Sequence, residues 1–160
     1  RSMKNLLFII NQIVPMIPNI QSLSEKIGVS RNSVLKALDL MAHAQIINLL
    51  RSSNKGVSFL QKPEKIFLEN PNLAFTFSGE KPNMGNLRET FFFNQLSVIG
   101  EVTAAKFGDF FVNGQYTFEI GGATKTAKQI QGVPLSYIAA DGIKNGVNNK
   151  IPLWLFGFLY

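Results

Sequence analysis

The segment GDFFVNGQYTFEIGG, residues 108–122, constrains the fold more than any other feature, because an Asn-Gly pair separates two runs rich in alternating apolar residues. This pattern predicts a β-hairpin. A two-residue loop would put Asp109 and Glu119 on opposite faces and mix apolar with polar side chains. A three-residue loop instead collects the apolar side chains on one face and the two carboxylates on the other. Because a one-residue slip would expose an entire apolar set, we expect the three-residue loop.

The predicted hairpin register makes Asp109 and Glu119 neighbours, and this pair is the candidate metal site of the chain. Carboxylate oxygens are the ligands that Mg²⁺ prefers, and a metal held in this way can assist the hydrolysis of a phosphodiester. The metal site depends on the register, since opposite faces would separate the two side chains.

Composition narrows the classes of protein that fit this chain. The 160 residues are 46% hydrophobic and 16% charged, which is typical of a folded chain with one domain or two small ones. The absence of cysteine and the single histidine exclude disulfides, zinc ribbons and cysteine nucleophiles. The longest apolar run, IPLWLFGFLY, is shorter than the roughly 20 residues of a membrane span. We therefore expect a cytoplasmic protein with no membrane partner and no signal peptide.

Positive charge is concentrated in the N-terminal part of the chain. Residues 1–65 contain nine Lys/Arg and three Asp/Glu, whereas residues 66–160 contain seven of each. A localised basic excess indicates an anionic partner such as nucleic acid. The pattern of apolar residues also changes near residue 65, from one typical of helices to one that is mostly typical of strands. We therefore predict two domains, residues 1–65 and residues 66–160.

The N-terminal domain shows the signals of three helices. Residues 3–14 are apolar enough for a buried helix. Ser22 followed by Glu25 is a capping box that opens a short second helix, and Gly28 ends it. Ser30 is a good N-cap for a third helix. The inward face of that helix is predicted to carry Val34, Leu38 and Met41.

Two strand patterns follow the helices, at residues 46–50 and residues 57–60, with the polar tip RSSNKG between them. Two helices joined by a tight turn and followed by a basic hairpin predict a winged helix-turn-helix. In that fold the start of the second helix of the motif enters a major groove and the wing reaches phosphates. The candidate contacts with double-stranded DNA are Arg31, Asn32, Ser33, Lys36, Arg51 and Lys55. A winged helix that only joins domains or binds protein is the structural alternative.

The C-terminal domain is predicted to be a compact α/β arrangement. A strand in EKIFLE and a short helix opening at Asn70 or Pro71 precede a longer helix in NMGNLRETFFFNQLSVI. Strands then follow in VTAAKFG, in the hairpin and in SYIAA. The apolar stripe of the longer helix is expected at Leu87, Phe91 and Val98. The segment IPLWLFGFLY is expected to be mainly core, with its aromatic residues as an interface if they are exposed.

From about residue 20 onward the chain resembles the C-terminal region of prokaryotic AAA+ superfamily ATPases of uncharacterised function. The residues that carry the resemblance are LSEKIGVSRNSVLKALDLMAHAQII, PEKIFLENPNLAF, NLRETFFFNQL, YTFEIGGATKTAKQI and NKIPLWLFGFLY. In that family a P-loop ATPase core precedes a winged helix and a PD-(D/E)XK nuclease-like domain with a central mixed sheet. The resemblance thus implies an α+β chain whose ATP site and ATPase core lie in another part of the parent protein.

The resemblance also implies a nuclease-like site. Active nucleases of that fold hold Mg²⁺ with an acidic residue on the first helix, an Asp and an Asp/Glu-x-Lys, which correspond here to Glu89, Asp109 and Glu119. The lysine position is occupied by Gly121, so we expect only a remnant of the nuclease site. Lys125 is a weaker candidate than the three acidic residues, as a replacement for the missing lysine. GGATKT lacks the Walker A spacing, so no ATP hydrolysis and no bound cofactor are expected from residues 1–160.

Three functions follow from these patterns. The first is a DNA-binding and regulatory part of an AAA+ ATPase, with a degenerate nuclease-like domain. The second is a metal-dependent nuclease that uses the three acidic residues. The third is a protein-interaction module that self-associates or binds the ATPase core without binding DNA.

Overall fold

The structure is a computed structural model that describes residues 2–53, 61–77 and 82–160. The chain forms two compact units, an N-terminal unit (Arg1–Pro82) and a C-terminal unit (Asn83–Tyr160). The first contains helices and a β-hairpin, and the second contains a mixed five-stranded sheet packed with helices, so the fold is α+β. Within the described ranges, every helix is too short or too polar to cross a membrane.

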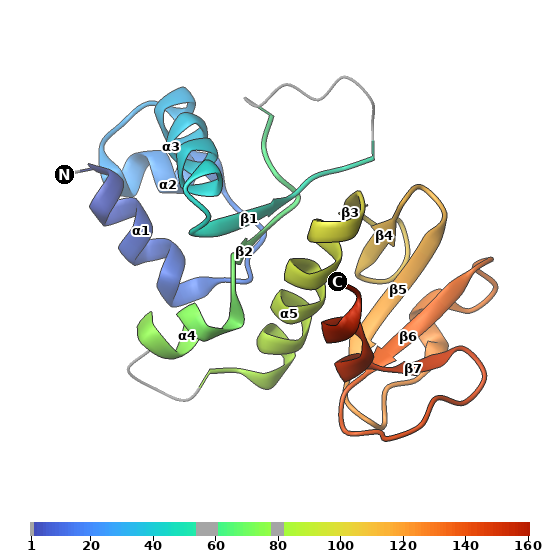
Figure 1. Ribbon diagram of the computed structural model, residues 1–160. Coiled ribbons are helices and arrows are strands. Elements are labelled where there is room, and N and C mark those ends of the chain that lie inside the picture. The colour runs from blue at the N-terminus through green and yellow to red at the C-terminus, as the bar shows by residue number, and fades with distance from the viewer. Residues whose placement is uncertain (1, 54–60, 78–81) are drawn as a thin grey trace. The chain divides into compact units, whose positions relative to one another are not determined.

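The described residues of the N-terminal unit form four helices and two strands. The helices are α1 (Ser2–Ile13), α2 (Ile20–Ile27), α3 (Arg31–His43) and α4 (Pro71–Phe77). The strands β1 (Ile47–Leu50) and β2 (Lys65–Leu68) pair with each other in antiparallel fashion. Figure 1 shows α2 and α3 joined by a short turn beside the hairpin.

Cap residues set the ends of α2 and α3. The side chain of Asn19 accepts a hydrogen bond from the Ser22 backbone N–H, so α2 begins three residues before the predicted capping box, and that prediction is wrong. Gly28 ends α2 with a φ of 73°, in the left-handed region that suits glycine. Ser30 caps α3, as predicted, by accepting a 3.1 Å hydrogen bond from the Ser33 backbone N–H.

The core of the N-terminal unit lies between α1, α2, α3 and the hairpin. Leu6, Ile10, Leu23 and Ile47 are buried there together with the predicted inward face of α3. The buried residues of that face are Val34, Leu35, Leu38 and Met41. The apolar periodicity of α3 therefore gives the correct inward face, and it leaves the opposite face to solvent.

The partner of β1 differs from the sequence prediction. β1 pairs with β2, with Ile47 opposite Leu68, and the strand expected at residues 57–60 lies outside the described residues. EKIFLE is a strand, as predicted, but it belongs to the N-terminal unit because it completes this hairpin. α4 also contacts α1 and β2, and the division between the two compact units falls after Pro82.

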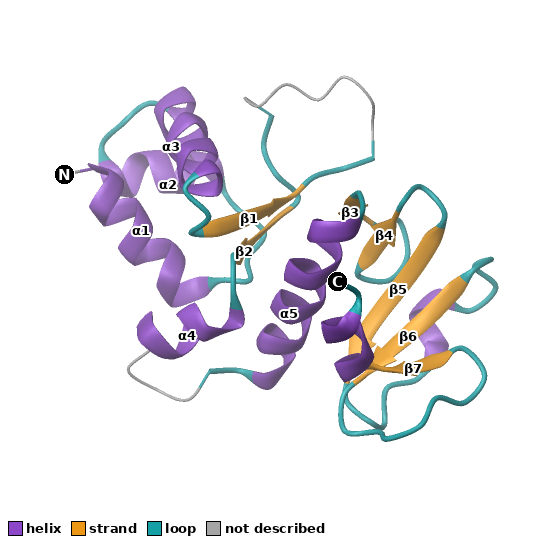
Figure 2. Ribbon diagram, in the orientation of Figure 1, coloured by secondary structure: helices purple, strands orange, loops and turns teal. Residues whose placement is uncertain are grey.

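The C-terminal unit is built around a mixed sheet in the order β3-β4-β5-β6-β7. Its strands are β3 (Val102–Ala104), β4 (Phe110–Val112), β5 (Tyr116–Gly121), β6 (Ser136–Ala140) and β7 (Lys150–Pro152). β3, β4 and β5 pair in antiparallel fashion, whereas β5, β6 and β7 run parallel. Figure 2 shows helices in front of this sheet and a short helical turn behind it.

The long helix α5 (Met84–Ile99) packs on one face of the sheet through aromatic side chains. The ring of Phe92 lies 5.3 Å from that of Phe110, 5.0 Å from that of Phe118 and 4.9 Å from that of Phe156. These separations are typical of stacked and edge-on aromatic pairs. The predicted stripe of α5 is wrong, because Val98 is 61% exposed and the buried face instead carries Thr90, Phe92, Phe93, Asn94 and Leu96.

The opposite face of the sheet is covered by the 3₁₀ helix η1 (Ala127–Ile130), where Ile130, Ile138 and Ala140 form a small buried cluster. The C-terminal segment forms a second 3₁₀ helix, η2 (Leu153–Phe158), which contacts α5. Leu153 and Phe156 are buried, but Phe158 is 77% exposed. The prediction that this segment is core therefore holds for only part of it.

Candidate functional site

The hairpin of β4 and β5 places the two candidate metal ligands on the same face. Phe111 pairs with Thr117 and Val112 pairs with Tyr116, which leaves a three-residue loop and confirms the predicted register. Asp109 directly precedes this ladder, and it is bonded on both sides of Glu119, because its N–H donates to the Phe118 carbonyl and its side chain accepts from the Ile120 N–H. The apolar side chains of the hairpin fill the face that packs against α5, so the two carboxylates point away from that aromatic core.

Glu119 is fully buried, with 0% of its surface exposed. The ammonium group of Lys125 forms an ion pair with Glu119 Oε1. No other polar group of the described residues hydrogen-bonds either carboxylate oxygen of Glu119. Burial of a carboxylate is costly unless a charge of opposite sign compensates it, so Lys125 is the group that makes this buried acid tolerable.

Gly121 provides the space through which Lys125 reaches Glu119. A Cβ atom at position 121 would lie 2.6 Å from Lys125 Cγ and 2.7 Å from both its Cβ and its Cδ. The stem of Lys125 therefore occupies the volume that any side chain at position 121 would fill. The turn that returns it begins at Gly122, whose carbonyl accepts a 3.0 Å hydrogen bond from the Lys125 N–H. A lysine from the loop thus reaches the buried glutamate of the strand over Gly121.

Burial raises the pKa of the Glu119 carboxyl above its usual value. The negative charges of Asp109 and Glu89 act in the same direction, while the hydrogen bond and the positive charge of Lys125 oppose them. The other two predicted acidic residues, Asp109 and Glu89, therefore both act electrostatically on Glu119. The site is a carboxylate cluster whose charge is balanced in part by one lysine.

Asp109 also has a structural role in the hairpin. Its Oδ2 accepts a 2.7 Å hydrogen bond from the Ile120 backbone N–H, which ties the carboxylate to β5. Glu89 comes from α5. Among the described side chains, no group of three or more acidic or histidine residues converges closely enough to hold a metal ion. Any metal here would therefore rely on Asp109 and Glu119 together with water.

The predicted DNA contacts on α3 lie on its outer face. Arg31, Asn32, Ser33 and Lys36 are all exposed, whereas the next residues inward, Val34 and Leu35, are buried. The Ser33 hydroxyl lies 2.9 Å from that of Ser30, so Ser33 contacts the N-cap residue and is also part of the exposed surface of α3. The first two turns of α3 therefore present two cations and two polar side chains to solvent.

The two predicted wing contacts have different outcomes. Arg51 Nη1 donates a 3.1 Å hydrogen bond to the Gln61 carbonyl, and its Nη2 lies 3.8 Å from Asp39 Oδ1. These contacts hold Arg51 within the N-terminal unit instead of leaving it extended toward a partner. Lys55 lies outside the described residues.

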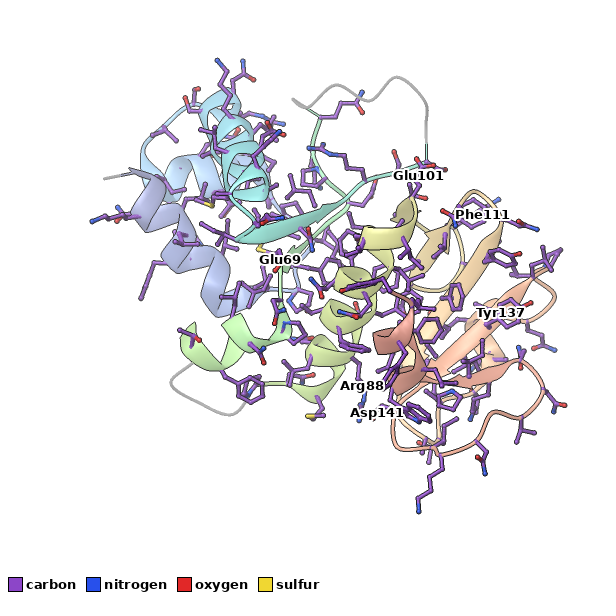
Figure 3. The ribbon with its side chains drawn as sticks, in the orientation of Figure 1. Glu69, Arg88, Glu101, Phe111, Tyr137 and Asp141 are labelled. Atoms are coloured by element: carbon purple, nitrogen blue, oxygen red, sulfur yellow. The ribbon has the colours of Figure 1, made fainter. Side chains whose placement is uncertain are left out.

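Sequence reasoning missed the ion pair between Arg88 and Asp141. Arg88 Nε donates a 2.9 Å hydrogen bond to Asp141 Oδ2, and Figure 3 shows the two side chains together at the junction of α5 and β6. The pair joins residues 53 positions apart, so no local pattern signals it. It fixes the start of α5, and with it Glu89, near the ends of β5 and β6.

Comparison with known proteins does not place the chain in a family: no protein-family model, no curated protein and no solved structure matches it.

Proposed function

We propose that this chain is a DNA-binding and regulatory part of an AAA+ superfamily ATPase, and that it binds duplex DNA through the outer face of α3. The observation that carries the proposal is the two-sided character of α3, which buries its apolar face and exposes Arg31, Asn32, Ser33 and Lys36. A helix held in this way by a preceding helix and a tight turn suits insertion into a major groove. The winged helix-turn-helix and the ATPase parent are parts of this proposal.

Charge supports the same assignment. The N-terminal unit contains ten Lys/Arg and five Asp/Glu, whereas the C-terminal unit contains six and five. A basic excess on one unit attracts phosphates and makes affinity fall with salt. The polar residues of α3 then supply hydrogen bonds to base edges, which a general electrostatic attraction does not.

Fluorescence anisotropy of a labelled random duplex tests the proposal. We expect the double variant Arg31→Ala, Lys36→Ala to raise Kd roughly tenfold, because each cation contributes a charge-assisted contact to a phosphate or base. The matched control is Lys4→Ala, Lys26→Ala, which removes the same charge from exposed positions on α1 and α2. An equal loss in both variants would contradict binding through α3. Unchanged affinity would favour a protein partner, either the ATPase core or a second copy of this chain.

A second candidate function, Mg²⁺-dependent cleavage of phosphodiesters, is favoured by the position of Lys125. The sequence predicts a remnant because Gly121 replaces the expected lysine, but the stem of Lys125 fills the space over Gly121 and its ammonium pairs with Glu119. The PD-(D/E)XK arrangement in this proposal would then have its lysine displaced along the chain. A cation at this place stabilises negative charge that develops on a reacting phosphoryl group.

The residues present fit a metal with few protein ligands. Mg²⁺ is commonly held by one or two carboxylates plus water, and Asp109 and Glu119 supply two, with both Glu119 oxygens free of hydrogen bonds to groups in the described ranges other than Lys125. When bound, the metal would supply Lewis-acid polarisation of a phosphoryl oxygen. Asp109 is oriented for this by its bond to the Ile120 N–H, and the charge of Glu89 adds to the attraction for a cation.

Cleavage of supercoiled plasmid in Mg²⁺ or Mn²⁺ tests this second function. Asp109→Ala and Lys125→Ala are each expected to abolish cleavage, whereas the exposed Lys128→Ala is expected to retain it. The decisive variant is Gly121→Lys, Lys125→Ala, which moves the lysine onto the strand and is expected to restore part of the activity. Cleavage that survives Asp109→Ala, or no cleavage by the native chain, would remove this candidate.

A further inference from the structure

A cavity of about 460 Å³ opens beside Lys125. One wall is formed by the loop after β5 and the other by the loop that joins β6 to β7. Its floor is Ile138, which is the register partner of Glu119 on the neighbouring strand. Cavities that hold small ligands typically enclose about 300–1,000 Å³. The size therefore suits an organic molecule, and its position puts that molecule next to the ion pair.

Among the described residues, two lysines and no carboxylate line this cavity. Lys150 Nζ donates a 3.0 Å hydrogen bond to the Ala123 carbonyl, which holds its ammonium at the rim. Lys125 is held by Glu119. An ammonium carries three donors, so each lysine keeps donors for a further acceptor. Within the described residues Lys125 is paired with Glu119, whereas Lys150 is bonded only to a carbonyl, so the ammonium of Lys150 is the charge at the rim that attracts an anion.

Asparagine side chains add neutral hydrogen-bonding groups to the same wall. Asn145 and Asn148 are exposed, and their side-chain amides make no hydrogen bond within the part of the chain that the structure describes. Asn148 has a φ of 54°, a conformation that asparagine tolerates better than most residues. Asn149 differs, because its Nδ2 donates to the Ser136 carbonyl and serves the fold. Two amides thus remain available to a ligand.

Apart from Thr126, the other lining residues are apolar. Ile138 and Ile143 belong to the small hydrophobic cluster behind the sheet, and Val147 is 66% exposed at the edge of the cavity. A simple anion would make no use of this surface. A ligand with a phosphate at one end and a ring at the other would contact the cations, the amides and the apolar residues together.

We propose that this cavity binds a nucleotide, with its phosphate between Lys125 and Lys150 and its base against Ile143 and Val147. The shared chemistry is a phosphate monoester on a nucleoside, which occurs in a free mononucleotide and at the phosphorylated end of a nucleic acid strand. The site is separate from the outer face of α3 and does not depend on duplex binding there. It gives the C-terminal unit a ligand of its own.

Isothermal titration calorimetry of the full chain with AMP, adenosine and inorganic phosphate tests the proposal. AMP is expected to bind more tightly than either of the other two, because only AMP occupies both ends of the cavity. Lys150→Gln is expected to weaken AMP binding roughly tenfold, since it removes a charge-assisted contact. The control is Lys144→Gln, an exposed lysine of the same loop that does not line the cavity and is expected to leave the affinity unchanged.

Asn148→Gly provides a second variant in case Lys150→Gln unfolds, because glycine accepts the positive φ while removing the amide. It is expected to weaken AMP binding less than loss of the lysine does. An octathymidylate with and without a 5′-phosphate distinguishes the two sources of the ligand. Preference for the phosphorylated oligonucleotide over AMP assigns the cavity to strand ends, and the reverse assigns it to free nucleotides.

Three results would overturn the proposal. They are no heat of binding with AMP or the phosphorylated oligonucleotide at millimolar concentration, AMP binding no tighter than inorganic phosphate, and equal losses in the Lys150 and Lys144 variants. The Arg31→Ala, Lys36→Ala variant is expected to bind AMP normally. Failure of this proposal is therefore distinguishable from failure of the duplex-binding proposal.

Discussion

The two charged regions of this molecule differ in how far their charged side chains are buried. On α3 the cations Arg31 and Lys36 are exposed, and the stability of the fold does not depend on them. In the C-terminal unit Glu119 is fully buried and forms an ion pair with Lys125. The comparison teaches that charge at a protein surface is available to a partner at little cost in stability, whereas charge inside a fold is coupled to its stability. Substitutions should therefore separate the two regions by which property they change.

The largest effect is expected from Lys125→Met, which leaves the buried Glu119 without its cation. Breaking a buried ion pair from one side costs several kcal/mol, and we expect about 3 kcal/mol here because Lys125 is itself 29% exposed. The measurement is urea denaturation at neutral pH. Lys128→Met, at an exposed lysine of η1, is the matched control and should change stability by no more than about 0.5 kcal/mol. Equal behaviour of the two variants would mean that the ion pair does not support the fold.

Gly121→Ala is the next in size, because its Cβ would overlap the Lys125 stem at 2.6–2.7 Å. Overpacking of this kind costs about 1–3 kcal/mol. The cost should largely disappear in a Lys125→Ala background, where the stem is absent. A double-mutant cycle measures this coupling. Additive effects of the two substitutions would show that Gly121 is not reserved for the lysine.

Protonation of Glu119 gives a third test. Since the pKa of Glu119 is raised in the folded state, the folded chain binds more protons than the unfolded chain between the ordinary glutamate value and the raised one. The contribution of this group to stability therefore falls as pH rises through that window, by at most about 1.4 kcal/mol per pH unit for one proton. Glu119→Gln should flatten the fall in the free energy of unfolding. A steeper fall in the variant would contradict the sign.

A smaller effect is expected in the N-terminal unit from Ser30→Ala. The Ser30 hydroxyl satisfies the Ser33 N–H at the start of α3, and loss of such a cap costs about 1 kcal/mol. Ser30→Asp retains an acceptor and is the control. Thermal unfolding of both variants checks the prediction. A loss of stability as large as that of Lys125→Met would weaken the contrast between the two regions.

The sequence predicted what local patterns determine. The hairpin register followed from the alternation of apolar residues around Asn113, and the inward face of α3 followed from its helical spacing. The start of α2 was missed because Asn19 and Ser22 are both acceptable caps and the choice depends on packing. Local signals decide between such alternatives only when one of them is much the stronger.

The pairings that were missed join distant residues. β1 pairs with β2 across a long connection, and Arg88 pairs with Asp141, which lies 53 residues later in the sequence. Lys125 was placed among the weaker candidates because its reach back to Glu119 depends on a turn and on an empty volume over Gly121. The sequence signal that could have indicated the contact between Lys125 and Glu119 is Gly121 itself, because a glycine inside a strand pattern often marks a place where another group approaches closely.

Stability and binding should separate most clearly for Arg31→Ala, Lys36→Ala. The two side chains are exposed, so the free energy of unfolding is expected to change by less than about 0.5 kcal/mol. The most direct test of the account is the salt dependence of duplex affinity, measured by anisotropy for the native chain and for this variant. If α3 meets the phosphates through both cations, the slope of log K against log salt becomes shallower by about 1.8, at roughly 0.9 per lost contact. An unchanged slope would contradict the claim that the outer face of α3 is where this chain binds DNA.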